Sequence, residues 1–122
     1  HADPATDYPF YWGHADERGE GDGLGTTLNL PLPQHTAIDA FRTAQCRALD
    51  AIGAFGPDLL VVSFGADTFE GDPISHLNLR TADYPALARD IVGCGWPTVV
   101  LMEGGYAVDA LGTNVAAFLG GF

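Results

Sequence analysis

The sequence contains no lysine, and its five arginines stand against sixteen aspartates and glutamates. The formal net charge at pH 7 is therefore −11. Such a surface repels nucleic acids and anionic lipids, and it attracts cationic partners over long range. Charge alone nevertheless favours the simpler interpretation that acidity serves solubility. The charge balance argues against nucleic-acid and membrane partners.

Cysteine and long apolar runs are also scarce. Cys46 and Cys94 lie far apart and belong to no C-x-x-C unit, so we expect reduced core residues in a cytoplasmic protein. No apolar run approaches the roughly 20 residues that span a bilayer, and no signal-peptide pattern follows His1. With 122 residues and a hydrophobic fraction of 47%, the chain is one modest domain or a piece of one. The oligomeric state stays open, a homo-oligomer included.

Several catalytic motifs are missing as well. The glycine-rich stretch 19–25 precedes a strand and lacks the Lys-Ser/Thr of a phosphate loop. Ser63 lacks the preceding glycine of a nucleophile elbow. The histidines are scattered, with no H-x-x-x-H pattern. These absences argue against a nucleotide-binding domain and a serine hydrolase.

The apolar pattern predicts alternating strands and helices. Continuous apolar runs at 59–64 and 98–103 are typical of parallel strands buried on both faces, and 28–32 predicts a shorter strand near a sheet end. Helical spacing covers 36–55 with Thr36 as cap, a segment from 81 or 83 to 92, and 108–119. The alternation predicts an α/β protein, a three-layer parallel sheet with flanking helices.

Two loops should meet at one edge of this sheet, because the strands at 59–64 and 98–103 are parallel. One loop carries Asp67 and the other Tyr106, each after a glycine turn. An acid and a phenol there suit a metal ligand and an oxyanion donor. Equally, Asp67 could cap a turn while Tyr106 packs. Asp72, before Pro73, suits a turn-fixing role.

Four segments of the sequence resemble a known family. "PDLLVVSFGADTFEGDPISHLNL" and "PTVVLMEGGYAVDALGTNVAAFLGGF" resemble the closing part of the zinc-dependent histone deacetylase and acetylpolyamine amidohydrolase family. "DYPFYWG" and "GEGDGLGTTLNLPLP" are similar to its aromatic-Pro loop, glycine-rich stretch and N-x-P-L strand, in the same order. The resemblance covers the whole chain and implies the arginase–deacetylase fold with one catalytic Zn²⁺.

The resemblance also implies roles for individual residues. Asp67 matches a zinc ligand, and Tyr106 matches the tyrosine that donates a hydrogen bond to the acetyl carbonyl oxygen. Tyr8 and Ile74 match apolar or aromatic residues of the substrate tunnel. Gly104 and Gly105 match the glycines beside the tyrosine, and we count all four among the substrate-binding positions.

The chain departs from the family in one respect. Family members take an aspartate and a histidine ligand from a D-x-H motif and a general base from adjacent histidines, and neither pattern occurs here. Both motifs lie upstream in the family, so we expect residues 1–122 to be the C-terminal fragment of a single deacetylase domain. Alone, the fragment should neither bind zinc tightly nor deacetylate a substrate.

Within the family, Glu103 and the sequence "FEGDPIS" resemble the acetylpolyamine amidohydrolase branch, which is mostly bacterial, more than the histone-specific members. The implied reaction is hydrolysis of the acetyl amide of a cationic acetylpolyamine or of acetyl-lysine. The alternative is a non-catalytic, deacetylase-like binding module. Retention of both Asp67 and Tyr106 argues against that alternative, because a binding remnant has no need of an oxyanion donor.

Overall fold

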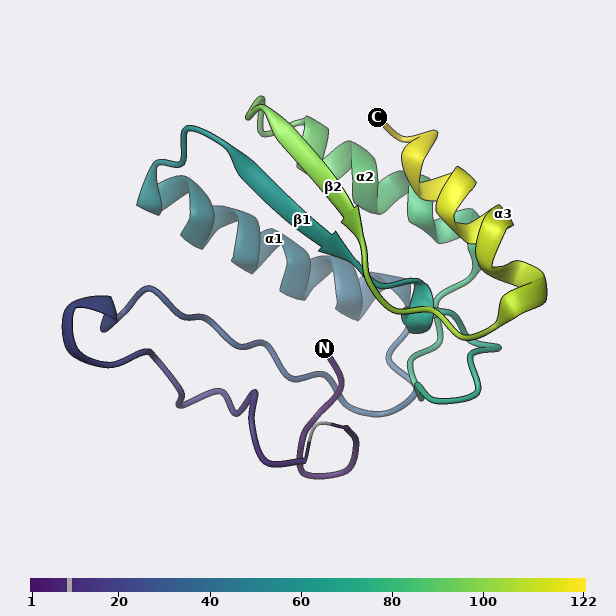
Figure 1. The fold of residues 1–122 in the computed structure, drawn as a ribbon, viewed down its shortest axis with the longest axis horizontal. Helices are drawn as coiled ribbons and strands as arrows, with labels where there is room; N and C mark the ends of the chain where they lie inside the picture. Colours follow the sequence, from purple (N-terminus) through teal and green to yellow (C-terminus); the bar gives the residue numbers. More distant parts are fainter. Residues whose placement is uncertain (9) are drawn as a thin grey trace.

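The computed structural model describes residues 1–8 and 10–122, and Figure 1 shows their arrangement. Within these residues, two strands and three α-helices alternate after a long N-terminal segment in which no described residue belongs to a regular strand. The elements are η1 (Gly21–Gly23), α1 (Ile38–Phe55), β1 (Leu60–Phe64), η2 (Ala66–Thr68), η3 (Thr81–Asp83), α2 (Tyr84–Val92), β2 (Thr98–Met102) and α3 (Val108–Leu119).

β1 and β2 pair in parallel, with Leu60 opposite Thr98 and Phe64 opposite Met102. The α2 helix connects them, so both strands run toward the same edge of the sheet (Figure 1). The α1 helix ends at Gly56, whose φ of 74° is left-handed and suits glycine. The predicted α/β arrangement of a parallel sheet with flanking helices is confirmed.

The core lies where β1 meets α2 and α3. Phe64 stacks on Phe118 with ring centroids 4.0 Å apart, and the Tyr84 ring meets Phe64 edge to face. Leu79 and Tyr84 are completely buried. Buried aromatic pairs of this kind contribute about 0.5–1.5 kcal/mol beyond their area burial. This cluster holds the end of β1, and therefore the loop after it, against the helices.

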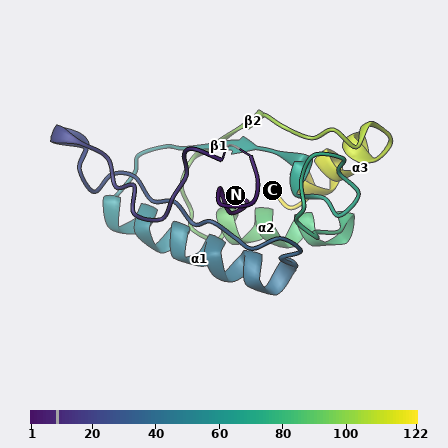
Figure 2. The same ribbon diagram turned by 90° about the horizontal axis from the view of Figure 1, so that it is seen from below.

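The described helices cover only one face of the sheet. Figure 2 shows α1 and α2 on the same side of β1 and β2. On the opposite face Val61, Val99 and Leu101 are 43–54% exposed. The prediction that both strands are buried on both faces is thus wrong for this chain, because no described element packs against that second face.

Three local predictions also need correction. Residues 28–32 form no strand; Leu32 makes a single bridge with Ala2, and the neighbouring prolines have no N–H to extend the pairing. The Thr36 hydroxyl donates to the carbonyl of Pro33 at 2.7 Å and does not cap α1. Cys46 and Cys94 are free thiols as expected, but Cys46 is exposed and Cys94 only partly buried, so neither belongs to the buried core. Among the described residues, no helix has the length and apolar character to cross a membrane.

Candidate functional site

The loops that follow β1 and β2 lie side by side. The backbone N–H of Glu103 donates to the carbonyl of Phe64 at 2.8 Å, which continues the strand pairing by one step. The N–H of Ala66 then donates to the carbonyl of Gly104, also at 2.8 Å. The segments 65–73 and 103–107 therefore leave the sheet together, as the parallel topology predicts.

Asp67 lies in the η2 turn with its carboxylate between two glycines. A Cβ atom on Gly104 would lie 2.3 Å from Asp67 Oδ2, and a Cβ atom on Gly65 would lie 2.5 Å from Oδ1. Any side chain at either position would therefore collide with the carboxylate. The glycine after each strand leaves the space in which the Asp67 carboxylate lies.

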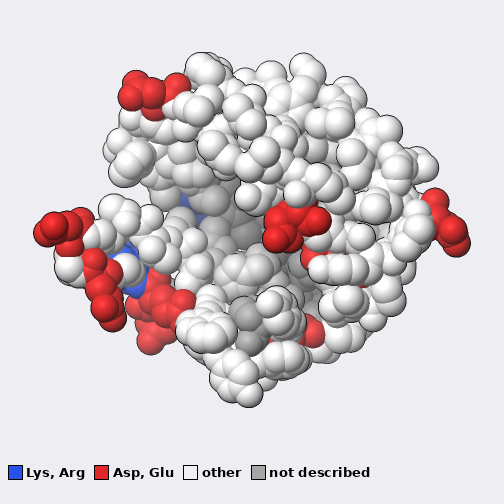
Figure 3. Space-filling model, in the orientation of Figure 1, with Lys and Arg blue, Asp and Glu red and all other residues white. Residues whose placement is uncertain are grey.

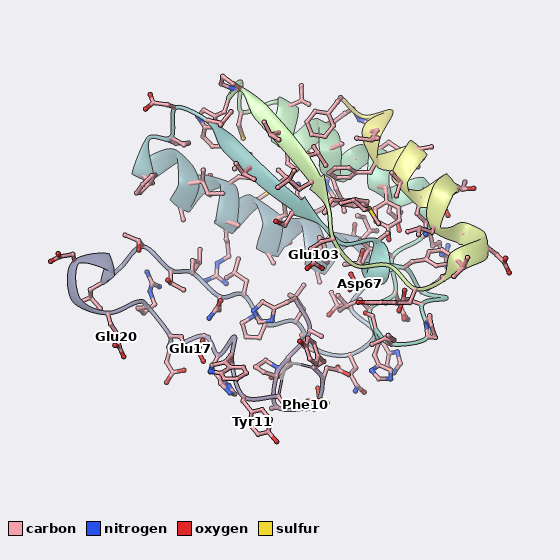
Figure 4. The ribbon with its side chains drawn as sticks, viewed as in Figure 1. Phe10, Tyr11, Glu17, Glu20, Asp67 and Glu103 are labelled. Atoms are coloured by element: carbon pink, nitrogen blue, oxygen red, sulfur yellow. The ribbon has the colours of Figure 1, made fainter. Side chains whose placement is uncertain are left out.

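Two carboxylates and one cationic group lie near Asp67. Burial raises the pKa of its carboxyl above the usual range, a hydrogen bond from its own backbone N–H lowers it, the nearby Asp72 and Glu103 carboxylates raise it further, and the N-terminal ammonium of His1 lowers it. Figure 4 shows Glu103 and Asp67 close together beyond the strand ends. Figure 3 shows one acidic group near the middle of this face and very few Lys or Arg atoms on it. A cation bound here would relieve this repulsion.

The buried Tyr84 side chain holds the η2 turn through its hydroxyl group. Its hydroxyl donates to the carbonyl of Ala66 at 3.2 Å and lies 3.0 Å from Thr68 Oγ1. Burial raises the pKa of Tyr84 to about 12. The phenol is therefore neutral at physiological pH and holds the residues on both sides of Asp67.

Replacing Tyr84 with phenylalanine should destabilise the protein while preserving the core. The ring would still pack on Phe64, but the carbonyl of Ala66 would lose one of its two donors, the other being the N–H of Phe69 at 3.3 Å, at a cost of about 0.5–1.5 kcal/mol. Urea unfolding should show a lower midpoint with an unchanged slope. Tyr11→Phe, which removes an exposed hydroxyl, is the control and should shift stability by less than about 0.5 kcal/mol. Equal midpoints for Tyr84→Phe and wild type would contradict this role.

A cavity of about 250 Å³ opens beside Asp67. Tyr8 and Ile74 line it together with the Asp67 side chain, so the fold brings these three predicted residues to one space. His76 Nδ1 lies 2.5 Å from Asp7 Oδ1, and this contact ties the loop of Tyr8 to the loop of Ile74. Tyr8 and Ile74 are otherwise exposed, which suits residues that line an open channel.

Tyr106 lies on the neighbouring loop and does not line this cavity. Its side chain is 49% exposed, and its backbone N–H donates to Asp72 Oδ2 at 2.7 Å. The preceding Gly105 has a φ of 135°, which L side chains rarely adopt, and a Cβ there would lie 2.8 Å from Leu111 Cδ1. Gly104 and Gly105 thus shape the Asp67 and Tyr106 region itself.

The two other acids of the loop after β1, Glu70 and Asp72, differ in burial and in partners. Glu70 is exposed and lies 3.6 Å from the Arg80 guanidinium, in keeping with a solvated residue. Asp72, in contrast, is buried and contacts both loops. The sequence signal was its place before Pro73, which predicted a turn-fixing role, and the N–H groups of Ile74 and Ser75 that donate to Oδ1 agree with that role. Tyr84 gave no local signal, since its partners are 16 and 18 residues away.

The described residues contain no cluster of three His, Cys, Asp or Glu side chains that could hold a metal ion. Zinc in catalytic sites takes three protein ligands, and carboxylate oxygen is one of the accepted donor types. The half-buried Asp67 carboxylate in a negative environment suits one such ligand. The donor set of this chain is therefore compatible with zinc but incomplete.

Comparisons with known proteins agree with this arrangement. The histone deacetylase domain model matches residues 1–122. The chain is 46% identical over 121 residues to acetylpolyamine amidohydrolase of Mycoplana ramosa. The aligned region covers 99% of this chain and 36% of that protein. It is 43% identical to acetylpolyamine amidohydrolase 1 of Pseudomonas aeruginosa, with 100% of this chain and 35% of that protein covered.

A solved structure gives the same result in three dimensions. The crystal structure of acetylpolyamine aminohydrolase from Burkholderia pseudomallei superposes with a TM-score of 0.95 at 40% identity, over 100% of this chain and 36% of that one. The chain thus spans about a third of the length of these relatives, and it has the α/β architecture of the arginase–deacetylase fold. By sequence and by structure, these 122 residues belong to the histone deacetylase family.

Proposed function

We propose that residues 1–122 form the C-terminal part of a single zinc-dependent deacetylase domain, which hydrolyses acetylated amines to acetate and a free amine. The observation that carries the proposal is the placement of the Asp67 carboxylate between Gly65 and Gly104, next to the loop of Tyr106. A carboxylate held in glycine-lined space, with a phenol-bearing loop beside it, suits a site built around a cation and a polarised carbonyl.

In this proposal Asp67 is one ligand of the metal, and the remaining ligands and the general base come from residues outside this chain. When bound, zinc acts as a Lewis acid toward the amide carbonyl and makes a nucleophile available at neutral pH. The Tyr106 hydroxyl donates a hydrogen bond to the carbonyl oxygen, on which negative charge develops during attack. Tyr8 and Ile74 line the path along which the acyl chain reaches the site, and Gly104 and Gly105 leave room for it.

The substrate class in this proposal is a cationic acetylated amine, either an acetylpolyamine or acetyl-lysine. The acidic surface supports a cationic substrate, since net charge steers ligands of opposite sign. The names of the two acetylpolyamine amidohydrolases compared above support the polyamine branch. The free thiols are in keeping with a cytoplasmic protein.

The test uses the complete reading frame that contains these residues. We expect the purified protein to release acetate from a monoacetylated diamine, to lose this activity on treatment with a chelator, and to regain it with Zn²⁺. The same assay on an acetyl-lysine peptide ranks the two substrate classes. If the complete protein binds acetylated ligands but turns none over, with the metal loaded, the non-catalytic binding module is the better account.

The 122-residue chain expressed alone is the matched comparison. With one metal-ligand candidate and an uncovered sheet face, it should bind Zn²⁺ weakly and show no deacetylation. Zinc titration monitored by calorimetry, together with the acetate assay, measures both. Chelator-sensitive activity of this chain alone would refute the view that part of the active site lies outside it.

A further inference from the structure

Asp72 is the most unusual polar group of the chain outside the residues assigned above. It is only 7% exposed, although a carboxylate is among the side chains that are almost never buried without partners. Its partners in the described part of the chain are backbone N–H groups and not cationic side chains. The buried charge is therefore balanced by the backbone itself.

Four N–H groups converge on the two oxygens of Asp72. Oδ1 accepts from Ile74 at 2.9 Å and from Ser75 at 3.2 Å, within its own loop. Oδ2 accepts from Tyr106 at 2.7 Å and from Ala107 at 3.3 Å, more than 30 residues away. One carboxylate thus joins the loop that lines the cavity to the loop that carries the phenol.

The Tyr106 side chain depends on this anchor for its position. None of the described hydrogen bonds involves its hydroxyl, and the residue is 49% exposed, so packing constrains the ring only in part. The residue follows two glycines, which resist backbone motion least. The bonds to Asp72 come directly after that flexible pair and just before α3 begins at Val108.

We propose that Asp72 is a positioning residue, which sets the place of the Tyr106 hydroxyl by holding the backbone of residues 106 and 107. This inference rests on the function proposed for Tyr106. The simpler alternative is that Asp72 only stabilises the fold as a negative charge near the start of α3, where acids are favourable. The two roles differ in what a substitution at Asp72 changes.

Asp72→Asn is the informative variant because it has the same shape. Asparagine has one acceptor oxygen and one NH₂ group, so it can serve only one of the two N–H pairs. If its oxygen remains toward Ile74 and Ser75, its NH₂ group faces the N–H donors of Tyr106 and Ala107. The loop of Tyr106 should then become more mobile, while the loop of Ile74 keeps its conformation.

The experiment combines kinetics with amide hydrogen exchange in the complete protein. For Asp72→Asn we expect kcat to fall by about 100-fold with little change in KM, since misplacement of a catalytic group by about 1 Å has this effect. Exchange should rise at residues 104–107 and stay unchanged in β2. In a Tyr106→Phe background, the same substitution should reduce kcat little further, because the group it positions is already absent.

Asp83→Asn is the matched control. Asp83, the last residue of η3, is also a carboxylate that accepts a backbone N–H, from Arg80 at 2.8 Å, but none of its described side-chain hydrogen bonds reaches either loop of the site. It should leave kcat and the exchange of residues 104–107 unchanged. An unfolded Asp72→Asn protein, unchanged exchange at 104–107, or an equal loss of kcat in the Tyr106→Phe background would overturn the positioning role.

The two proposals fail in different ways. Absence of deacetylation by the wild-type protein with metal loaded overturns the proposed function. The exchange comparison still decides whether Asp72 holds the Tyr106 loop, since it needs no turnover.

Discussion

Substituting alanine for Gly104 should abolish metal binding and activity in the complete protein while leaving its fold intact. The added methyl group would lie 2.3 Å from Asp67 Oδ2 and 2.9 Å from Asp67 Cγ, closer than atoms can approach. The obstructing atoms are the end of a side chain, so the carboxylate can turn away without disrupting the backbone. A displaced carboxylate is nevertheless a lost ligand, which reduces metal affinity by more than the 10–100-fold typical of outer-shell changes.

Gly112→Ala is the control for this substitution. Gly112 lies in α3, and a Cβ atom there meets nothing within 4 Å. Alanine in an exposed helix interior favours the helix by roughly 0.5–1 kcal/mol. We expect Gly112→Ala to retain full zinc content, measured by elemental analysis, and full activity. Full zinc content in a folded Gly104→Ala protein would show that Asp67 is not a ligand in this geometry.

Replacing Tyr106 with phenylalanine should reduce kcat by about 10²–10³, the loss found when one oxyanion donor is removed. The substitution deletes only the hydroxyl, for which no hydrogen bond is found within the described residues. Because the side chain is half-exposed, stability and metal content should not change. KM should change little, since the donor acts on charge that develops only during attack.

Tyr11→Phe is the matched control for Tyr106→Phe. Tyr11 is 78% exposed in the N-terminal segment and contacts Trp12 edge to face, a contact that phenylalanine preserves. Steady-state kinetics on an acetylated diamine should show wild-type values for this variant. A Tyr106→Phe protein with wild-type kcat would exclude the phenol as oxyanion donor and leave Tyr106 as a residue of the loop surface.

The strands and helices were largely predictable from the sequence. Unbroken apolar runs predicted β1 and β2, and helical spacing placed α1 and α3 to within two residues at each end. The prediction failed where an element needs a partner. Residues 28–32 have strand alternation, but a strand exists only when a neighbouring backbone supplies its hydrogen bonds, and here Ala2 alone does so.

For the candidate site, the sequence was sufficient to propose the participating residues but not the residues that hold them in place. Glycine after each strand and the parallel topology were sufficient to expect Asp67 and Tyr106 near one another. The proline after Asp72 predicted a turn-fixing role, but nothing local showed that Asp72 is buried and reaches a second loop. Only the fold places Asp72 within reach of Tyr106, 34 positions away, and leaves Glu70 in solvent.

The sequence by itself determined the alternation of strands and helices, the acidic surface, and the two glycine turns that carry Asp67 and Tyr106. These properties follow from local periodicity and residue chemistry, which need no tertiary contact. The tertiary structure alone decided which face of the sheet is covered, which glycine makes room for which carboxylate, and which carboxylate holds the Tyr106 loop. Those outcomes depend on hydrogen bonds and close contacts between distant residues, which form only when the packed core brings the two strand ends together.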